Sequence, residues 1–434
     1  MTRLLTMIRI GLLGCGTVGG GVVQLLRTNA ASLEARMGAP FELVRVLVLD
    51  PSVVTLKELD RSCLTTDAER VIGDPSIDVV IEVMGGVDPT RDYVGRAIAA
   101  GKQVVTANKA LLARHGAELL DRAHEHGVDM AFEAAVGGGI PIIRVVRDAL
   151  AGDTISSLSG IVNGTSNYIL SRMQADGMPF EAALKEAKEK GYAEANPTLD
   201  VGGGDAAHKL VVLAMLAFGA RLDGVSILTE GIDAVEPVDH SFADRFGFVV
   251  KLLAIAKEHG KKLELRVHPT LVDKDAPLAG VHGVLNAIAI EGRALGPCFL
   301  SGRGAGAHPT AVSVVGDLVD VAIAKRNGTA GQRTRAIRLA KRELLPAEDI
   351  ESRYYFRFSV FDRPGVLAKI TGALGQRGVS IEQMVQQGRG SGDVPVDVVI
   401  LTHESKEADV QAALDVIGKS DFVAKPPRMI RVHG

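Results

Sequence analysis

The feature that most constrains the fold is a glycine motif that directly follows an apolar run near residue 10. Residues Ile8–Leu13 are almost all apolar, as in a central parallel strand. They lead into G-x-G-x-x-G, and a helical stretch follows. In this pattern the first glycine allows the turn, the second lets backbone N–H groups approach a pyrophosphate, and the third packs helix on strand. The context predicts a doubly wound α/β domain whose dinucleotide contacts are Gly14, Gly16, Thr17, Val18 and Gly19.

A second predicted strand, residues 41–49, ends at Asp50. An acid at this strand end usually hydrogen-bonds the adenosine ribose of NAD. The segment between Gly19 and Asp50 is longer than the roughly 20 residues of the usual fingerprint, so we expect an extended helix or loop there. The alternative is that Asp50 is an ordinary loop acid before Pro51.

Two more apolar runs predict neighbouring strands of the same sheet. Residues 79–84 precede Gly85 and Gly86, and Gln103–Thr106 precedes Lys109. Both strand ends should lie at the carboxyl edge of the sheet, where doubly wound folds bind their ligands.

Acids and a lysine surround a glycine-rich loop within residues 187–209, AKEKGYAEANPTLDVGGGDAAHK. A helix should end at Gly191, and Asp205 should open a strongly apolar helix. Lys209 follows four residues later and therefore shares a helix face with Asp205. Such a pair is most often a surface ion pair worth a few tenths of a kcal/mol. The nearby acids Glu194 and Asp200 and the apolar helix favour a site that moves a proton on a small polar substrate instead.

Composition bounds the class of protein. A chain of 434 residues with 47% hydrophobic and 23% charged residues should hold two or three globular domains. The net charge of −3 argues against nucleic-acid or membrane partners. Three cysteines without C-x-x-C spacing argue against disulfides and zinc, and so for a cytoplasmic protein. The longest apolar run, residues 210–218, is too short to span a membrane. The basic residues in 325–342 lack aromatic neighbours, so we interpret that stretch as a solvated linker.

The block A-x3-G-Y-A-x2-N-P-x2-D-V-x-G-x-D-x3-K, which ends at Lys209, resembles the signature of homoserine dehydrogenase. The segments EVMGG, VVTANKALL, NGT-x-NYIL and G-x-G-A-x-P-T resemble the same family. The resemblance implies that Lys209 is the proton donor and acceptor and that Asp205 orients it. It also implies that Glu194, together with Asp200, binds the substrate.

The same resemblance implies further ligand contacts. It places Lys109 beside the nicotinamide and the substrate, and Gly306 in the cofactor pocket with Gly85 and Gly86. Relatives that favour NADP often carry an Arg beside the ribose-binding acid, whereas Leu49 stands there in this chain, which argues against an NADP preference. The sequence as a whole leaves NAD and NADP as alternatives. A sodium ion is expected mostly on carbonyls, at Glu133, Val136, Gly138 and Ile140. From the residues alone, this glycine-rich stretch indicates only a tight turn between domains.

The two helix starts with polar side chains have open interpretations. Asn163 and Thr165 begin a predicted helix, where they could bind a carboxylate or simply cap the helix. His308 precedes a proline at another helix start and is read as structural. Between 227 and 300 the chain alternates strand-like and helical runs, with residues 246–260 amphipathic.

The last part of the chain has the order β-α-β-β-α-β, with strands at residues 354–360, 379–384, 396–401 and 429–432. With the segments DRPGVLAKI and GVSIEQM, it resembles an ACT regulatory domain. Such domains usually bind an amino acid between paired copies, and the expected effector is threonine.

These observations predict a Rossmann-type domain at 1–133 with 303–325 returning to it, an α+β substrate and dimerisation domain at 134–302, a linker at 326–351 and a ferredoxin-like ACT domain at 352–434. The implied activity is NAD(P)-dependent interconversion of aspartate 4-semialdehyde and homoserine by a homodimer or homotetramer. The rival hypothesis is a catalytically idle protein that senses cofactor and amino acid.

Overall fold

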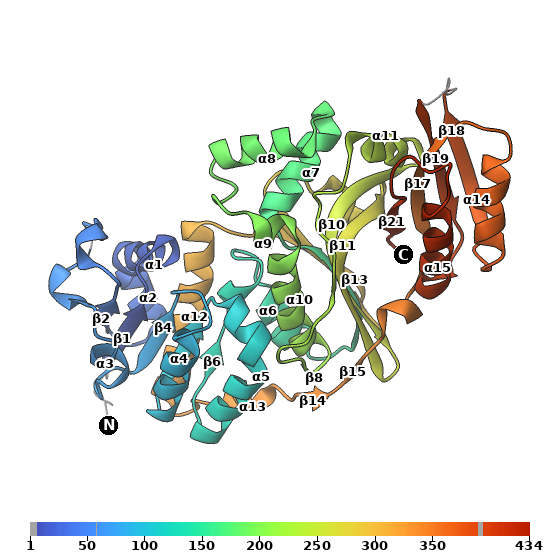
Figure 1. The fold of residues 1–434 in the computed structure, drawn as a ribbon. Helices are drawn as coiled ribbons and strands as arrows, with labels where there is room; N and C mark the ends of the chain where they lie inside the picture. Colours follow the sequence, from blue (N-terminus) through green and yellow to red (C-terminus); the bar gives the residue numbers. More distant parts are fainter. Residues whose placement is uncertain (1–6, 58, 389–393) are drawn as a thin grey trace. The chain divides into compact units, whose positions relative to one another are not determined.

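The computed structural model describes residues 7–57, 59–388 and 394–434, and the chain divides into two compact units (Figure 1). The first unit holds the chain up to Leu158, Asp205–Ser226 and Leu285–Arg342. The second holds Ser159–Gly204, Ile227–Val284 and Glu343–Gly434. The predicted domain ranges include residues 1–6, 58 and 389–393, which lie outside the described residues.

A six-stranded parallel sheet forms the centre of the first unit, with strand order β3-β2-β1-β4-β5-β6. The strand order reverses between β1 and β4, which creates the crevice where doubly wound folds bind ligands. This confirms the predicted α/β class. The strands are β1 Ile8–Leu13, β2 Phe41–Leu47, β3 Leu64–Thr65, β4 Val79–Glu82, β5 Gln103–Thr106 and β6 Met130–Ala131.

Two predicted strand ends are wrong, each for a local reason. Strand β2 ends at Leu47, because the chain then turns into a short 3-10 helix, Pro51–Val53, that Asp50 caps by accepting from Ser52 N at 2.8 Å. Strand β4 ends at Glu82, because its carboxylate accepts the N–H of Met84 at 2.8 Å and so turns the chain out of the sheet.

Helices cover this sheet, and one of them comes from far along the chain. Helix α12 packs against α1, where a Cβ on Gly21 would come within 2.7 Å of the Ala307 carbonyl oxygen. By length and composition α12 alone, among the described helices, could cross a membrane, but half of its apolar window is buried inside the protein. The helices are α1 Thr17–Thr28, α2 Ala30–Met37, α3 Glu69–Ile72, α4 Thr90–Ala99, α5 Lys109–His126 and α12 Ala307–Asn327.

The remaining elements of the first unit are shorter. They include an antiparallel hairpin, β12 with β13, and the apolar helix α10. Their bounds are α6 Ile142–Arg144, α10 Gly204–Ala217, β8 Ala220–Arg221, β12 Leu285–Gly292, β13 Gly296–Arg303, α13 Gln332–Ala336 and β14 Ala340–Lys341, while β7 Ile155–Ile161 leads into the second unit.

The second unit is organised around a long antiparallel hairpin, β10 with β11. The amphipathic interpretation of residues 246–260 is wrong, because this stretch contains strand β10, which is buried on both faces from Phe248 to Ala256. The elements are α7 Gly164–Asp176, α8 Phe180–Glu189, α9 Thr198–Val201, β9 Leu228–Thr229, α11 Pro237–Arg245, β10 Phe248–His259 and β11 Lys262–Asp273.

The same unit contains the β-α-β-β-α-β module predicted from the sequence. Its sheet continues from β11 in the order β11-β21-β17-β19-β18, because β21 pairs with β11 in parallel through Thr270 and Arg431. Helices α14 and α15 pack on its aromatic core, which includes Phe356 and Phe358. The elements are β17 Tyr354–Phe361, α14 Val366–Gly375, β18 Ile381–Gln387, β19 Pro395–Thr402, α15 Glu407–Gly418 and β21 Arg428–Val432, and the connection before them carries β15 Glu343–Leu344 and β16 Glu351–Ser352, the latter paired with β20 Ser405–Lys406.

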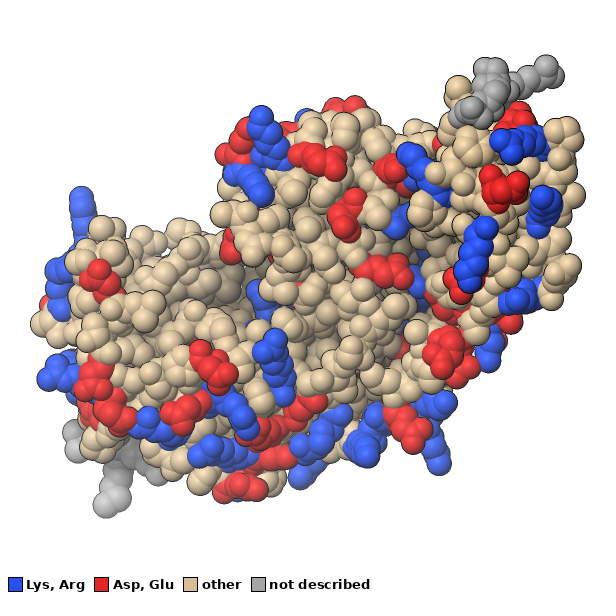
Figure 2. All heavy atoms as spheres, in the orientation of Figure 1, with Lys and Arg blue, Asp and Glu red and all other residues tan. Residues whose placement is uncertain are grey.

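Surface charge is mixed on the face drawn in Figure 2, where Lys and Arg lie among Asp and Glu rather than in a field of one sign.

Candidate active site

Two lysines share one buried carboxylate at the start of α10. Lys209 Nζ lies 2.7 Å from Asp205 Oδ2, and Lys109 Nζ lies 3.0 Å from Asp205 Oδ1. Asp205 is 4% exposed and Lys209 8% exposed. The i,i+4 pair is therefore not an exposed ion pair. Its charges are held out of water at fixed positions, as in many functional sites.

A network of polar side chains positions Lys109, and the sequence analysis did not predict this network. It is the first residue of α5, which Asn108 caps by accepting from Leu111 N at 3.0 Å. The Asn108 amide donates to the Gly86 carbonyl at 2.6 Å. Thr106 Oγ1 donates to the buried Glu82 carboxylate at 2.5 Å, and burial raises the pKa of Glu82 above its usual range. The only sequence signal for Glu82 was an acid inside an otherwise apolar strand.

The glycine motif forms an open cradle at the start of α1. Gly14 has a φ of +97°, and a Cβ on Gly19 would lie 2.2 Å from the Gly14 carbonyl oxygen. A side chain is therefore excluded at both positions. A Cβ on Gly16 would meet only open space, and no side chain caps α1 there. Backbone N–H groups at this helix end thus face a region that fits a pyrophosphate.

The other predicted cofactor residues lie in the same unit, in the first turn of α1 and in two loops. Thr17 is exposed and Val18 is half-buried in the first turn of α1. Gly85 and Gly86 have φ values of +75° and +71° after β4, and Gly306 has a φ of +119° before α12. These conformations favour glycine.

Asp50 is exposed beyond β2 and already has a local partner. Hydrogen bonds from Ser52 hold the pKa of its carboxyl below the usual range. Leu49 beside it is 99% exposed.

The stretch predicted to bind sodium is a tight turn whose polar groups are mostly engaged. The Glu133 carboxylate accepts the N–H groups of Ile143 at 2.8 Å and Arg144 at 3.0 Å. The Gly138 carbonyl accepts the Ser313 hydroxyl at 2.6 Å and keeps a second lone pair. A cation in this turn would therefore be held by carbonyl oxygens and not by the Glu133 carboxylate. Val136 and Ile140 are buried in the same turn, and the Ile140 carbonyl accepts the N–H of Ile142 at 2.7 Å.

In the second unit, the helix-start residues hold the loop that carries the predicted substrate acids. Asn163 caps α7 by accepting from Ser166 N at 2.8 Å, and its amide donates to Asp200 at 2.7 Å. Thr165 donates to the Tyr192 carbonyl at 2.6 Å. The capping interpretation is therefore confirmed for Asn163. Glu194 is exposed on the same loop.

A parallel sheet whose strand order reverses, a glycine cradle, and two lysines on one buried carboxylate in the same unit define an NAD(P)-dependent oxidoreductase. Comparison with protein families adds the particular family. Residues 14–133 match "Homoserine dehydrogenase, NAD binding domain", 141–319 match "Homoserine dehydrogenase" and 354–419 match "ACT domain". The chain belongs to the homoserine dehydrogenase family, and its C-terminal module is an ACT domain.

Two relatives and one solved structure match this chain over nearly its full length, and a second solved structure matches over part of it. The chain is 43% identical to a homoserine dehydrogenase of Synechocystis sp. over 434 residues, covering 98% of this chain and 99% of that one. It is 42% identical to that of Bacillus subtilis, with 98% of each covered. The crystal structure of a homoserine dehydrogenase from Thiobacillus denitrificans aligns with a TM-score of 0.93 and 43% identity, covering 99% of this chain and 98% of that one. A hyperthermophilic archaeal homoserine dehydrogenase in complex with NADPH aligns over 73% of this chain and 98% of that one, with a TM-score of 0.62 and 25% identity.

Proposed function

We propose that the chain interconverts L-aspartate 4-semialdehyde and L-homoserine, with Lys209 as the proton donor and acceptor. The observation that carries this proposal is the buried carboxylate of Asp205 bound to both Lys209 and Lys109. When bound, the nicotinamide supplies the hydride to the aldehyde carbon or takes it from the alcohol carbon.

The chain's own groups handle the oxygen and its proton. As hydride reaches the aldehyde carbon, negative charge develops on the oxygen, and an ammonium beside it lowers the barrier. Lys209 then donates its proton to that oxygen, which becomes the hydroxyl of homoserine. Asp205 fixes the direction of the Lys209 ammonium, and Lys109 adds positive charge. In the reverse direction Lys209 takes the hydroxyl proton. Glu194 and Asp200 bind the polar end of the substrate.

The direct test is homoserine-dependent reduction of NAD and of NADP, followed at the nicotinamide absorbance. Activity with homoserine, and none with the one-carbon-shorter serine, supports the proposal. A folded protein that shows no activity with either cofactor refutes the proposal and favours the catalytically idle sensor.

We propose that the cradle of Gly14, Gly16 and Gly19 and the loops of Gly85, Gly86 and Gly306 hold either cofactor, with Asp50 on the ribose.

For the ACT domain we propose threonine as a feedback inhibitor. A cavity of about 330 Å³ lies beside the loop that begins α14, and its lining includes Asp362, Arg363 and Gln386. Side chains of both charges match the ammonium and carboxylate of an amino acid. Inhibition by L-threonine and not by D-threonine in the same assay tests this proposal.

Three further properties belong to the proposal. The enzyme acts in the cytoplasm, as a homodimer or homotetramer, which light scattering of the purified protein tests. A sodium ion binds through the carbonyls around Gly138, and exchange of sodium for a large organic cation should lower thermal stability. Nucleic acid and membranes are not partners.

A further inference from the structure

Helix α10 carries Asp205 and Lys209, and residues 201–204 before Asp205 are called the glycine loop below. This loop lies directly against a second backbone segment. A Cβ on Gly231 would come within 2.6 Å of the Val201 carbonyl oxygen and 2.9 Å of Gly202 Cα. Ile232 N donates to the same Val201 carbonyl at 2.8 Å. Residues 230–232, which we call the backing segment, therefore touch the glycine loop backbone to backbone. Any shift of this segment displaces the loop, which ends at Gly204, one residue before Asp205.

Glu230, the first residue of the backing segment, is tied to the ACT domain. Its backbone N–H donates to the Val267 carbonyl of β11 at 2.8 Å. Its carboxylate Oε1 lies 2.9 Å from Nη1 of Arg431, which belongs to strand β21. The side chain of Glu230 is 35% exposed and that of Arg431 only 1% exposed.

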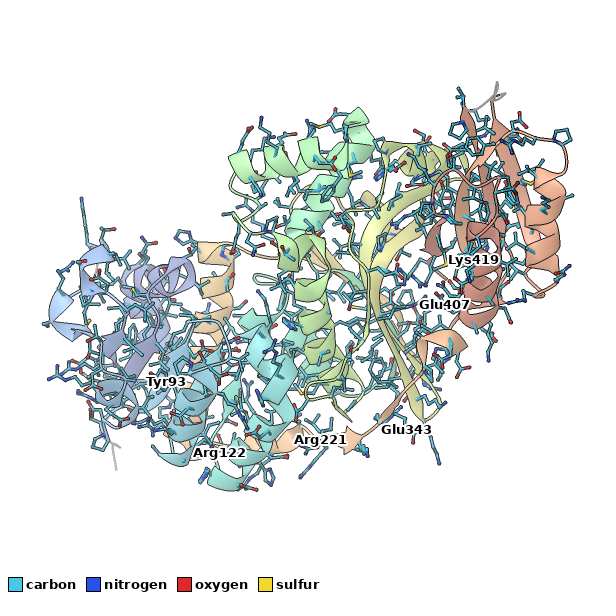
Figure 3. All side chains as sticks on the ribbon, viewed as in Figure 1. Tyr93, Arg122, Arg221, Glu343, Glu407 and Lys419 are labelled. Atoms are coloured by element: carbon cyan, nitrogen blue, oxygen red, sulfur yellow. The ribbon has the colours of Figure 1, made fainter. Side chains whose placement is uncertain are left out.

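The other end of the Arg431 guanidinium binds Glu407, at the start of α15. Figure 3 labels Glu407. Nε donates to Glu407 Oε2 at 2.9 Å and Nη2 donates to Oε1 at 2.6 Å, so the contact is bidentate. Tyr354 also donates to Glu407 Oε2, at 2.9 Å. Burial acts to raise the pKa of Glu407, but Arg431 outweighs it and the pKa lies below its usual range. A single buried guanidinium thus joins a helix of the ACT domain to the backing segment.

We propose that Glu230 and Arg431 are positioning residues that hold the glycine loop against the ACT domain, and that the loop in turn sets the backbone of Asp205, the residue that follows it. The inference rests on the proposed roles of Asp205 and Lys209. In the described interactions Arg431 binds Glu230 and Glu407 and no catalytic group. The placement of the Asp205 backbone depends on Arg431 because the loop has three consecutive glycines, Gly202, Gly203 and Gly204, and little stiffness of its own.

The chain offers a matched control at another contact between the same two parts. Arg357 of β17 binds Asp239 of α11, with Nε 2.7 Å from Oδ1. Like Arg431, Arg357 joins the ACT domain to a segment outside it, here helix α11. In the described interactions, however, neither Arg357 nor Asp239 contacts the backing segment. Arg357→Lys therefore weakens the attachment of the ACT domain without releasing the glycine loop.

The experiment measures kcat, the KM for homoserine, the KM for the cofactor and Tm in the full chain. Glu230→Gln keeps the shape of a partly exposed side chain and removes only its charge, so the fold survives. We expect kcat/KM for homoserine to fall roughly tenfold, within the range of site-to-site couplings, with an unchanged KM for the cofactor. Arg357→Lys should leave both constants for homoserine unchanged while lowering Tm.

A double variant separates positioning from general loosening. If Arg431 acts through Glu230, then Arg431→Lys lowers kcat/KM in the wild-type background but adds little when Glu230→Gln is already present. Wild-type kcat and KM in Glu230→Gln, or an equal loss of activity in Arg357→Lys, would overturn the inference. A wild-type protein that is silent with homoserine would instead refute the proposed function, and the inference with it.

Discussion

Replacing Asp205 by Asn tests how much the shared carboxylate contributes to catalysis. The amide keeps one acceptor oxygen, so one lysine retains a weaker hydrogen bond, while the other faces an NH2 group. Hydrogen bonds to charged groups contribute about 1.5–3 kcal/mol each. Losing one of them and weakening the other should cost about 2–4 kcal/mol of transition-state stabilisation, or roughly 30- to 1,000-fold in kcat/KM. The size of the effect follows from burial, since Asp205 is 4% exposed.

The assay is steady-state oxidation of homoserine, with cofactor affinity measured separately from the enhanced fluorescence of bound NADH. Cofactor affinity should stay within the wild-type range, because the glycine cradle is untouched. Asp121→Asn is the matched control, since Asp121 forms an exposed pair with Arg221 at 2.7 Å in the same unit (Figure 3 labels Arg221). Its activity should be unchanged. An Asp205→Asn enzyme with wild-type kcat/KM would show that the two lysines need no shared carboxylate, and the reasoning would fail.

Three other changes have defined outcomes. Lys209→Ala should lower kcat by roughly 10²–10⁴ while the fold and NADH binding survive, and retained activity would remove Lys209 from the mechanism. Leu49→Arg, beside Asp50, should raise the ratio of NADP to NAD kcat/KM about fivefold by adding an exposed cation, and an unchanged ratio would place the ribose elsewhere. Lys251 is buried with its Nζ 2.6 Å from the Val281 carbonyl, and burial lowers its pKa to about 8. Below pH 8 Lys251 is charged in the folded protein. Between pH 8 and its unfolded pKa near 10.5, Lys251 is neutral in the folded protein but still protonated in the unfolded chain. The free energy of unfolding therefore rises with pH over this range. Lys251→Met should raise the unfolding free energy at pH 7 by about 2 kcal/mol. In urea titrations between pH 8 and 10.5 the stability of this variant should no longer increase with pH, and a stability profile parallel to that of the wild type would contradict the reasoning.

Sequence reasoning was most successful where the signal is local. The order strand, G-x-G-x-x-G, helix placed β1 at Ile8–Leu13, and the i,i+4 spacing placed Lys209 on the face of Asp205. Both depend on the geometry of one or two turns of backbone. Residues 246–260 misled the interpretation, because a strand covered on both faces lacks the two-residue alternation that marks a half-buried one.

The missed residues are those whose partners lie far away along the chain. Glu82 meets Thr106, and Arg431 meets Glu230 and Glu407. No periodicity connects such pairs, so a single sequence shows them only as an odd polar residue within an apolar run. Lys109 was found through family resemblance and not through spacing, and its contact with Asp205 is a product of the tertiary fold.

Because α12 packs on the first sheet, its late position in the chain determines the order in which the parts of this protein can fold during synthesis. The core beneath α1 contains Val22 and Leu26 from the beginning of the chain and Val314 and Leu318 from α12. A ribosome must therefore make the chain past Asn327 before the cofactor domain can close, although that domain begins near residue 8. Until then the nascent chain exposes an apolar surface to which chaperones can bind. The cofactor domain is started first but cannot be completed until the substrate segments have already emerged.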